Sequence, residues 1–380
     1  MGWMGRTGRA LPFAAIVMAM LFAQPVGAHK PVTSKYTFTE DVYPIVNRAC
    51  GACHRPGGVA PMSLLTYDEA RPWAESIRLE LASGHMPPWF GNPSVAELKD
   101  SHKLSPRDLD VVLTWVTGGT PQGPENASSA GAAKSGAARI GPGRHGWRRG
   151  RPDMTVIMPA SFSLPAGKGE DTQEFLLPTA RDRDRFISAA DLLPGNPAIV
   201  HDALIFVRST GEKDRVVAAW LPGSVPVAAG AGVGFLWRAG EQLGVRIHYK
   251  KTWKFENKAA ADRSTVGLYL TKAAARGVRS LDLPSSGAVI DEDSQALAVT
   301  VVRTDDTSGD VDVDNVFIEA VRPDGSRVPV IGFGARRGWN QRYWLASPLT
   351  LAKGTRLDVK TAGNTPSSLR LSLDMVRASS

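Results

Sequence analysis

The chain has 380 residues, of which 43% are hydrophobic and 22% are charged, so it can bury apolar cores in two or three domains. The formal net charge is +8, but the export signal at the start of the chain argues against a nucleic-acid partner. Both of the 2 cysteines fall in one short motif. We therefore expect packing, together with any bound metal, to stabilise the domains in place of disulfides.

The first residues have the pattern of a secretory signal peptide. Arg6 and Arg9 precede an apolar run at 11–23, which is too short to span a membrane comfortably. Small residues at 26–28 then offer a cleavage site. We expect the mature chain to begin at His29, to be periplasmic or secreted, and to have no stable membrane span after cleavage. An uncleaved membrane anchor is the alternative.

The next recognisable feature is Cys50-Gly51-Ala52-Cys53-His54, which follows an apolar helical pattern at 38–46. Two thiols at this spacing can add to both haem vinyl groups, and the adjacent histidine then binds the iron as proximal ligand. A thioredoxin-like dithiol would need a βαβ context, and a zinc site would need a second ligand pair. We therefore expect one covalent haem c, attached to Cys50 and Cys53 and ligated by His54.

Two more helices follow, over Tyr67–Ser83 and from Ser105-Pro106 to Gly118-Gly119, where Ser105 is an N-cap. This order of helix, haem motif, loop and closing helix resembles the small class I cytochrome c domain over residues 36–121. The resemblance implies a small all-α domain that carries electrons.

The sixth iron ligand is expected in the loop between those two helices. Met86 is followed by two prolines and a tryptophan, and a thioether ligand raises the haem potential, which suits electron transfer. Met62 is the competing thioether. His85, His102 or an open coordination position remain further alternatives.

Residues 122–151 are rich in Ala, Gly, Ser and Pro, and they end in a cluster of arginines. This composition is typical of a flexible tether. The arginines are either simply solvated or form a docking patch for an acidic electron-transfer protein or an anionic lipid.

From Asp153 onward, short alternating segments separated by Gly, Pro and Asp predict an all-β region of two packed halves. Four segments within it occur in a familiar order: Pro194-Gly195-Asn196, residues 200–206, residues 244–249 and Asp262-Arg263-Ser264. This order resembles the copper type II, ascorbate-dependent monooxygenases, the group of peptidylglycine α-hydroxylating and dopamine β-monooxygenases. Bacterial relatives with an N-terminal cytochrome c also match the Met86 loop and residues 339–355.

The second resemblance implies two copper centres in two jelly-roll halves. One copper would be held by an adjacent histidine pair and a distant histidine, which correspond to His201, Asp202 and His248, with aspartate in the second position. The other copper requires a His-x-His pair and a methionine, but no histidine follows His248, and Met375 is the one methionine after Met158. The oxygen-activating centre is therefore missing. The three residues can still hold one copper or zinc, or they are remnants bonded to backbone carbonyls.

The complete expectation is a small all-α cytochrome c domain followed by an all-β double jelly-roll sandwich. Its parts are a signal peptide at 1–28, a cytochrome domain at 29–121, a basic linker at 122–151, and sandwich halves at 152–290 and 291–380. The expected function is an exported monohaem cytochrome that exchanges single electrons with a periplasmic redox partner protein. In it the degenerate monooxygenase-like region serves for docking or holds one metal. The alternatives are an active haem- and copper-dependent monooxygenase-type oxidoreductase and a binding subunit of a periplasmic redox assembly.

Overall fold

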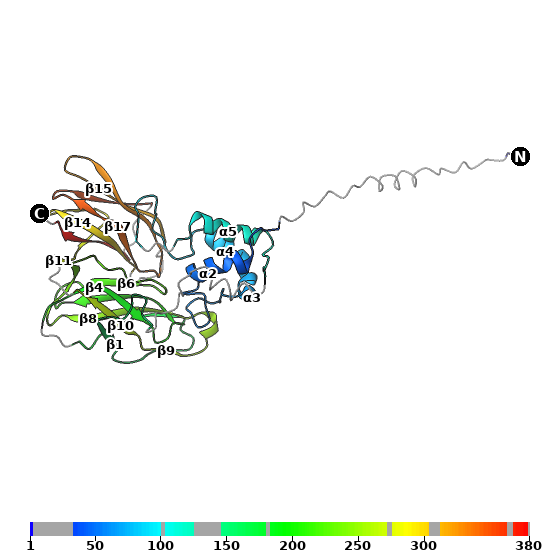
Figure 1. Cartoon of the computed structure of the whole chain (residues 1–380), viewed down its shortest axis with the longest axis horizontal. Helices are drawn as coiled ribbons and strands as arrows, with labels where there is room; N and C mark the ends of the chain where they lie inside the picture. Colours follow the sequence, from blue (N-terminus) through cyan, green and yellow to red (C-terminus); the bar gives the residue numbers. More distant parts are fainter. Residues whose placement is uncertain are drawn as a thin grey trace.

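The computed structural model describes residues 1–2, 33–99, 103–124, 146–179, 183–271, 276–303, 312–362 and 368–378. Most of the expected signal peptide and most of the expected linker lie outside these ranges. Of the described residues, 41% are in strands and 14% are in helices. Figure 1 shows the helices together at one end of a larger body of strands.

The helical segment begins at residue 33 and contains short helices around one small core. Their bounds are η1 (Phe38–Val42), α2 (Tyr43–Ala49), α3 (Tyr67–Ala70), η2 (Arg71–Trp73), α4 (Ala74–Ala82) and α5 (Pro106–Thr117). Thr66 and Glu69 form a capping box at the start of α3, and Ser105 accepts a hydrogen bond from the backbone of Asp108 at the start of α5. The predicted helix over Tyr67–Ser83 is therefore present, interrupted by one 3₁₀ turn.

Trp115 of α5 is the centre of the helical core. Its indole ring is fully buried, lies 5.7 Å from the ring of Phe38, and donates a hydrogen bond to the carbonyl oxygen of Pro121. Val42 and Val112 pack into the same cluster. This core holds α2, which precedes the cysteine motif, against α5.

Residues 88–99, which we call the bridging segment, leave the helices and join the strands. Gly91 pairs with Phe333, and Leu98 pairs with Leu345. Trp89 is buried in the core of the strand-rich C-terminal part, where it meets Tyr343 edge-to-face at 5.0 Å. The segment thus supplies backbone hydrogen bonds and apolar side chains to a body far away in sequence.

The expectation of a separate, small all-α N-terminal domain is wrong. The chain is mainly β, and its helices are short. The bridging segment contains Gly91 and Pro93, which disfavour a helix. Its apolar residues Trp89 and Leu98 are covered by strands of the C-terminal region. The N-terminal part is therefore a helical segment attached to a β body by pairing and by a shared core.

The first β-sandwich follows residue 153 and encloses one large apolar core. Its sheets have the strand orders β1-β10-β4-β7-β11 and β3-β8-β5-β6, with β2-β9 as a separate pair. The bounds are β1 (Met154–Ile157), β2 (Phe162–Leu164), β3 (Glu170–Leu176), β4 (Arg185–Leu193), β5 (Val200–Arg208), β6 (Arg215–Trp220), β7 (Val233–Trp237), β8 (Gln242–Lys250), η3 (Trp253–Phe255), β9 (Ala260–Asp262), β10 (Thr265–Leu270) and β11 (Arg276–Gly277).

The second β-sandwich has the strand orders β12-β19-β14-β17 and β13-β18-β15-β16. The bounds are β12 (Arg279–Asp282), β13 (Ala288–Val289), β14 (Ser294–Arg303), β15 (Val313–Val321), β16 (Arg327–Ala335), β17 (Gln341–Leu351), β18 (Arg356–Thr361) and β19 (Leu369–Arg377). The change from one sandwich to the other falls between β11 and β12. Trp344 of β17 packs into the core cluster of the first sandwich, so the two bodies share apolar contacts.

The bridging segment covers the edge strands of the second sandwich. β16 and β17 are edge strands of its two sheets, and the bridging segment pairs with both of them. Unpaired sheet edges invite pairing with other chains.

Among the described residues, no helix combines the length and apolar character needed to cross a membrane.

Candidate functional site

The Cys-Gly-Ala-Cys-His motif forms a tight turn directly after α2. The backbone N–H of Cys50 donates to the carbonyl of Val46 at 2.8 Å, and the N–H of His54 donates to the carbonyl of Cys50 at 2.8 Å. Both thiols are free and half-buried. Burial raises the pKa of Cys50 to about 12 and that of Cys53 to about 11. Dithiol oxidoreductases show the opposite, a lowered thiol pKa.

His54 is oriented as a metal-binding histidine requires. Its Nδ1 lies 3.2 Å from the carbonyl oxygen of Met62. A carbonyl only accepts, so Nδ1 carries the proton and Nε2 keeps its lone pair. Burial also lowers the pKa of His54, which favours the neutral ring. A hydrogen bond behind a ligating histidine is the usual means of fixing its ring.

The cysteine motif lies at the edge of the helical core. Cys50 is partly buried against this core, as are Met62, Trp73, Ile77, Leu81 and Leu104. The residues present therefore match the chemistry of covalent haem attachment.

The four candidate sixth ligands differ in their environment. The Met62 backbone lies on the Nδ1 side of His54, because its carbonyl oxygen contacts that nitrogen. Met86 is 38% exposed, and its backbone N–H donates to the carbonyl of Glu80. His85 is also exposed and lies 3.4 Å from the Glu80 carboxylate. His102 is outside the described residues.

The second group of candidate residues meets on the first sandwich because β5 contains a bulge. Val200 pairs with Tyr249 and Asp202 pairs with His248, so His201 is an extra residue in the β5–β8 register. A bulge changes the direction of neighbouring side chains, which a regular strand would send to opposite faces. The bulge brings the His201 and Asp202 side chains together, opposite His248.

Asp202 is the centre of this cluster. One of its carboxylate oxygens accepts from Nδ1 of His201 at 3.1 Å and from Nδ1 of His248 at 2.9 Å. The other accepts from Nδ2 of Asn340 at 2.8 Å. Burial alone would raise the pKa of Asp202, but the bonds from the two histidines outweigh it and hold that pKa at about 2. Asp202 is therefore an ionised carboxylate in a fully buried position.

The second sandwich completes the walls of the cluster. The Trp339 ring lies 4.3 Å from the His201 ring, and Asn340 reaches Asp202 from the loop before β17. At the outer side, Nε2 of His248 lies 3.8 Å from the exposed carboxylate of Glu170. The sequence singled out the two histidines and Asp202 but not Trp339 or Asn340 as parts of this site. Asn340 is 138 positions away from Asp202.

His201, Asp202 and His248 can each offer a ligand atom such that all three atoms lie within 4.8 Å of one another. Burial lowers the pKa of His201, so this ring is neutral and its unprotonated nitrogen can bind a metal. A cation there would also balance the buried charge of Asp202. The residues thus fit one Zn²⁺ or Cu²⁺, with Asp202 as a ligand or as the group that orients both histidines.

The described residues do not offer the ligands of a second copper centre. Met375, the methionine that such a centre would use, is fully buried in the apolar core of the second sandwich. This burial agrees with the sequence observation that no histidine follows His248.

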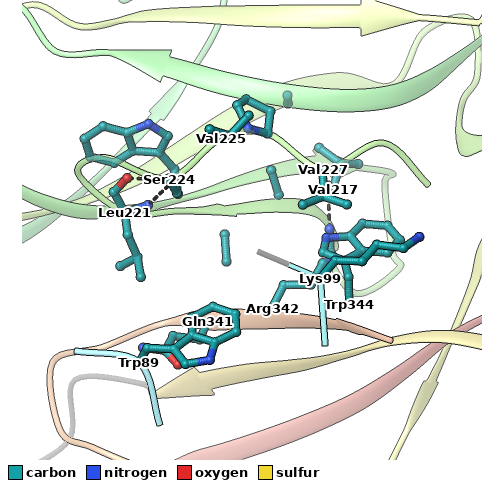
Figure 2. Close-up of a pocket in the computed structure, with 15 residues that line it drawn as sticks. Trp89, Lys99, Val217, Leu221, Ser224, Val225, Val227, Gln341, Arg342 and Trp344 are labelled. Carbon is teal, nitrogen blue, oxygen red and sulfur yellow. Dashed lines mark hydrogen bonds between the residues drawn. The ribbon is translucent and has the colours of Figure 1, made fainter. Parts of the chain in front are cut away.

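A small cavity of about 60 Å³ lies where the bridging segment and both sandwiches meet. Trp89, Gln341, Arg342 and Trp344 are among the residues that line it (Figure 2). This volume is enough for a few water molecules. The cavity lies at the junction of the bridging segment with the two sandwiches.

No protein-family model matches the chain, and no curated protein matches it. Among solved structures, N-glycanase F (PNGase F) has 8% identity and a TM-score of 0.29, covering 59% of this chain and 95% of that chain. The STIV MCP has 11% identity and a TM-score of 0.26, covering 58% and 96%. A turret protein in Sulfolobus turreted icosahedral virus has 10% identity and a TM-score of 0.14, covering 59% and 98%. TM-scores this low carry no argument about the site.

Proposed function

We propose that this protein is a c-type cytochrome that carries single electrons on one covalently attached haem. Cys50 and Cys53 would form the two thioether bonds, and His54 would bind the iron through Nε2. The observation that carries the proposal is the combination of this motif with the His54–Met62 hydrogen bond, which leaves Nε2 free for a metal.

Met86 is the sixth ligand of this proposal. The Met62 backbone contacts the Nδ1 side of His54, the side away from the nitrogen that would bind the iron. Met86 is on a different loop and is 38% exposed. A thioether favours reduced iron, which suits an electron carrier.

The haem, when bound, supplies the one-electron redox chemistry. Cys50 and Cys53 would hold it through two covalent bonds on a turn that is itself hydrogen-bonded to α2. The Met62 carbonyl sets the ring orientation of His54 and would increase its basicity as a ligand.

Intact-mass measurement after denaturation tests the proposal. The protein is produced with a cytochrome c maturation system, and we expect each chain to retain the mass of one haem. Replacing both thiols, Cys50→Ala with Cys53→Ala, should remove that mass, while His85→Ala, at an exposed site in the same region, should not. A denatured chain with two free thiols and no added mass would refute the proposal.

The two methionines form a matched pair for the sixth ligand. Met86→Ala should abolish the far-red charge-transfer absorption of methionine-ligated ferric haem and lower the reduction potential. Met62→Ala should preserve the absorption band, because the backbone carbonyl that holds His54 remains. Loss of the band in Met62→Ala alone would assign the ligand to Met62 instead.

A second candidate function is an oxidoreductase in which the haem supplies electrons to one metal at His201, Asp202 and His248. Three ligand atoms within 4.8 Å of one another, one of them from an ionised carboxylate, favour it. Metal analysis of protein purified without chelators tests this candidate. One copper per haem, lost on His248→Ala, would support it, whereas haem iron with no other bound metal would exclude it.

A further inference from the structure

The strongest unassigned feature is the contact between the haem-attachment motif and the loop that joins β6 to β7. The Cys53 sulfur lies 3.9 Å from the carbonyl oxygen of Pro222. Next to it, Gly223 has φ +88, and a Cβ at this position would lie 2.3 Å from the Cβ of Ala52. Glycine is needed here both for its backbone conformation and for its lack of a side chain. The β6–β7 loop therefore lies directly against the cysteine that would carry the haem edge.

This loop leads directly to the cluster of His201, Asp202 and His248. Pro222 follows Trp220, the last residue of β6, by two positions, and Trp220 pairs with Ala203 of β5. Ala203 is bonded to Asp202. Standard chain geometry limits this route, from the Cα of Pro222 to that of Asp202, to about 17 Å.

The route is also held rigidly. Within the loop, the Leu221 N–H donates to the Ser224 hydroxyl, and the Ser224 hydroxyl donates to the Leu221 carbonyl at 2.7 Å. At its start, the Trp220 side chain hydrogen-bonds to Asp191 of β4. These contacts hold the part of the loop that runs from β6 to Pro222 and Gly223.

We propose that the β6–β7 loop is the path by which an electron passes from the haem to a metal held by His201, Asp202 and His248 in the same chain. The proposal rests on the cytochrome function and on metal binding at the cluster. The haem iron would give one electron, going from Fe(II) to Fe(III), and a Cu(II) ion held by the cluster would take it, becoming Cu(I). An external one-electron reductant would restore the haem. The first sandwich is thus the internal redox partner of the haem.

The test measures haem reoxidation in the protein that contains both haem and Cu(II). The haem is reduced by a light flash in the presence of a photosensitiser, and its visible absorbance is followed. We expect first-order reoxidation at a rate independent of protein concentration. Loading with Zn(II), which accepts no electron, should abolish this phase.

Gly223→Ala should slow the phase several-fold or more, because its methyl group pushes the loop away from Ala52. Gly211→Ala is the matched control: Gly211 also has positive φ, at +79, but no atom lies near its missing Cβ. It should leave the rate unchanged. Ala52→Gly combined with Gly223→Ala restores the space and should recover much of the rate. If Gly223→Ala does not fold, Ala52→Leu disturbs the same contact from the other side.

Each contrary result has a distinct meaning. Unaltered rates in both Gly223→Ala and Ala52→Leu would overturn the route, as would a rate proportional to protein concentration. A haem-loaded protein that binds no copper would also overturn it, while leaving the cytochrome proposal intact. A chain without covalent haem would refute the cytochrome proposal itself.

Discussion

At the scale of single residues, Asp202 determines what the histidine pair can do. Its ionised carboxylate receives both Nδ1 atoms and is held from the opposite side by Asn340. Such a carboxylate either ligates a metal or fixes the rings that do. An aspartate exposed to solvent would be less effective in both roles, because water would compete with it for the metal and for the histidine rings.

Asp202→Asn therefore should weaken metal binding, because it removes the negative charge and one acceptor while keeping the volume. We expect the affinity for copper or zinc to fall by roughly ten- to a hundredfold, measured by competition with a chelator. Glu170→Gln is the control: Glu170 is exposed and lies 3.8 Å from His248. Equal affinities of Asp202→Asn and the unaltered protein would show that the carboxylate takes no part.

Asp191 contacts Trp220, at the start of the β6–β7 loop, and makes a pH-dependent contribution to the stability of the folded protein. Burial raises the pKa of Asp191 from 3.8 to about 6 in the folded protein. The folded state therefore binds this proton more tightly than the unfolded state, and the contribution of Asp191 to stability is present at low pH. It is lost as the pH rises from about 4 through about 6, at a cost of up to about 3 kcal/mol.

Urea unfolding of the unaltered protein and Asp191→Asn, compared at about pH 4 and about pH 7, checks this expectation. The unaltered protein should lose stability relative to Asp191→Asn as the pH rises. A stability difference that stays constant over this range would show that Asp191 titrates normally.

Sequence reasoning reached some of these residues and not others, for identifiable reasons. Cys50, Cys53 and His54 are adjacent, so their spacing alone defines a chemistry. His201 and His248 can be recognised only through a resemblance to a known family. No sequence pattern predicts the bulge that brings His201 to Asp202. Asn340 belongs to a loop of the other sandwich, and only the folded structure brings it to Asp202.

At the scale of elements, the bridging segment explains why the helical part is not an independent domain. Capping at Thr66 and Ser105 marks the helix starts, so those helices could be predicted from the sequence. By contrast, Gly91 and Pro93 are typical of an ordinary loop. The pairing of residues 88–99 with β16 and β17 depends on sheet edges that lie hundreds of positions later in the chain. No local sequence pattern predicts this pairing.

Trp89→Ala should therefore destabilise the β body as well as the helical segment. Trp89 is 7% exposed and packs against Tyr343, so its truncation should cost about 3–5 kcal/mol of unfolding free energy. Trp253, which is 64% exposed, gives the control, and Trp253→Ala should change stability by less than about 0.5 kcal/mol. Urea unfolding followed by far-UV circular dichroism measures both. Similar effects of the two substitutions would contradict the bridging role.

At the scale of the whole molecule, the chain has two candidate redox positions, one on the helical segment and one on the first sandwich. The helical segment presents the cysteine motif, the first sandwich supplies the histidine cluster, and the second sandwich covers that cluster with Trp339 and Asn340. The contact of Cys53 with Pro222 joins the first two parts. The arrangement suits a carrier whose electron acceptor lies within its own chain.

The most direct test of this account is whether the cysteine motif carries haem. Intact mass is measured after denaturation and compared with the reduced visible spectrum of the same sample, produced with a cytochrome c maturation system. The account predicts one haem mass per chain, with the spectrum of a c-type cytochrome, and the absence of both when Cys50 and Cys53 are replaced by alanine. Two free thiols, no added mass and no haem absorbance would contradict it.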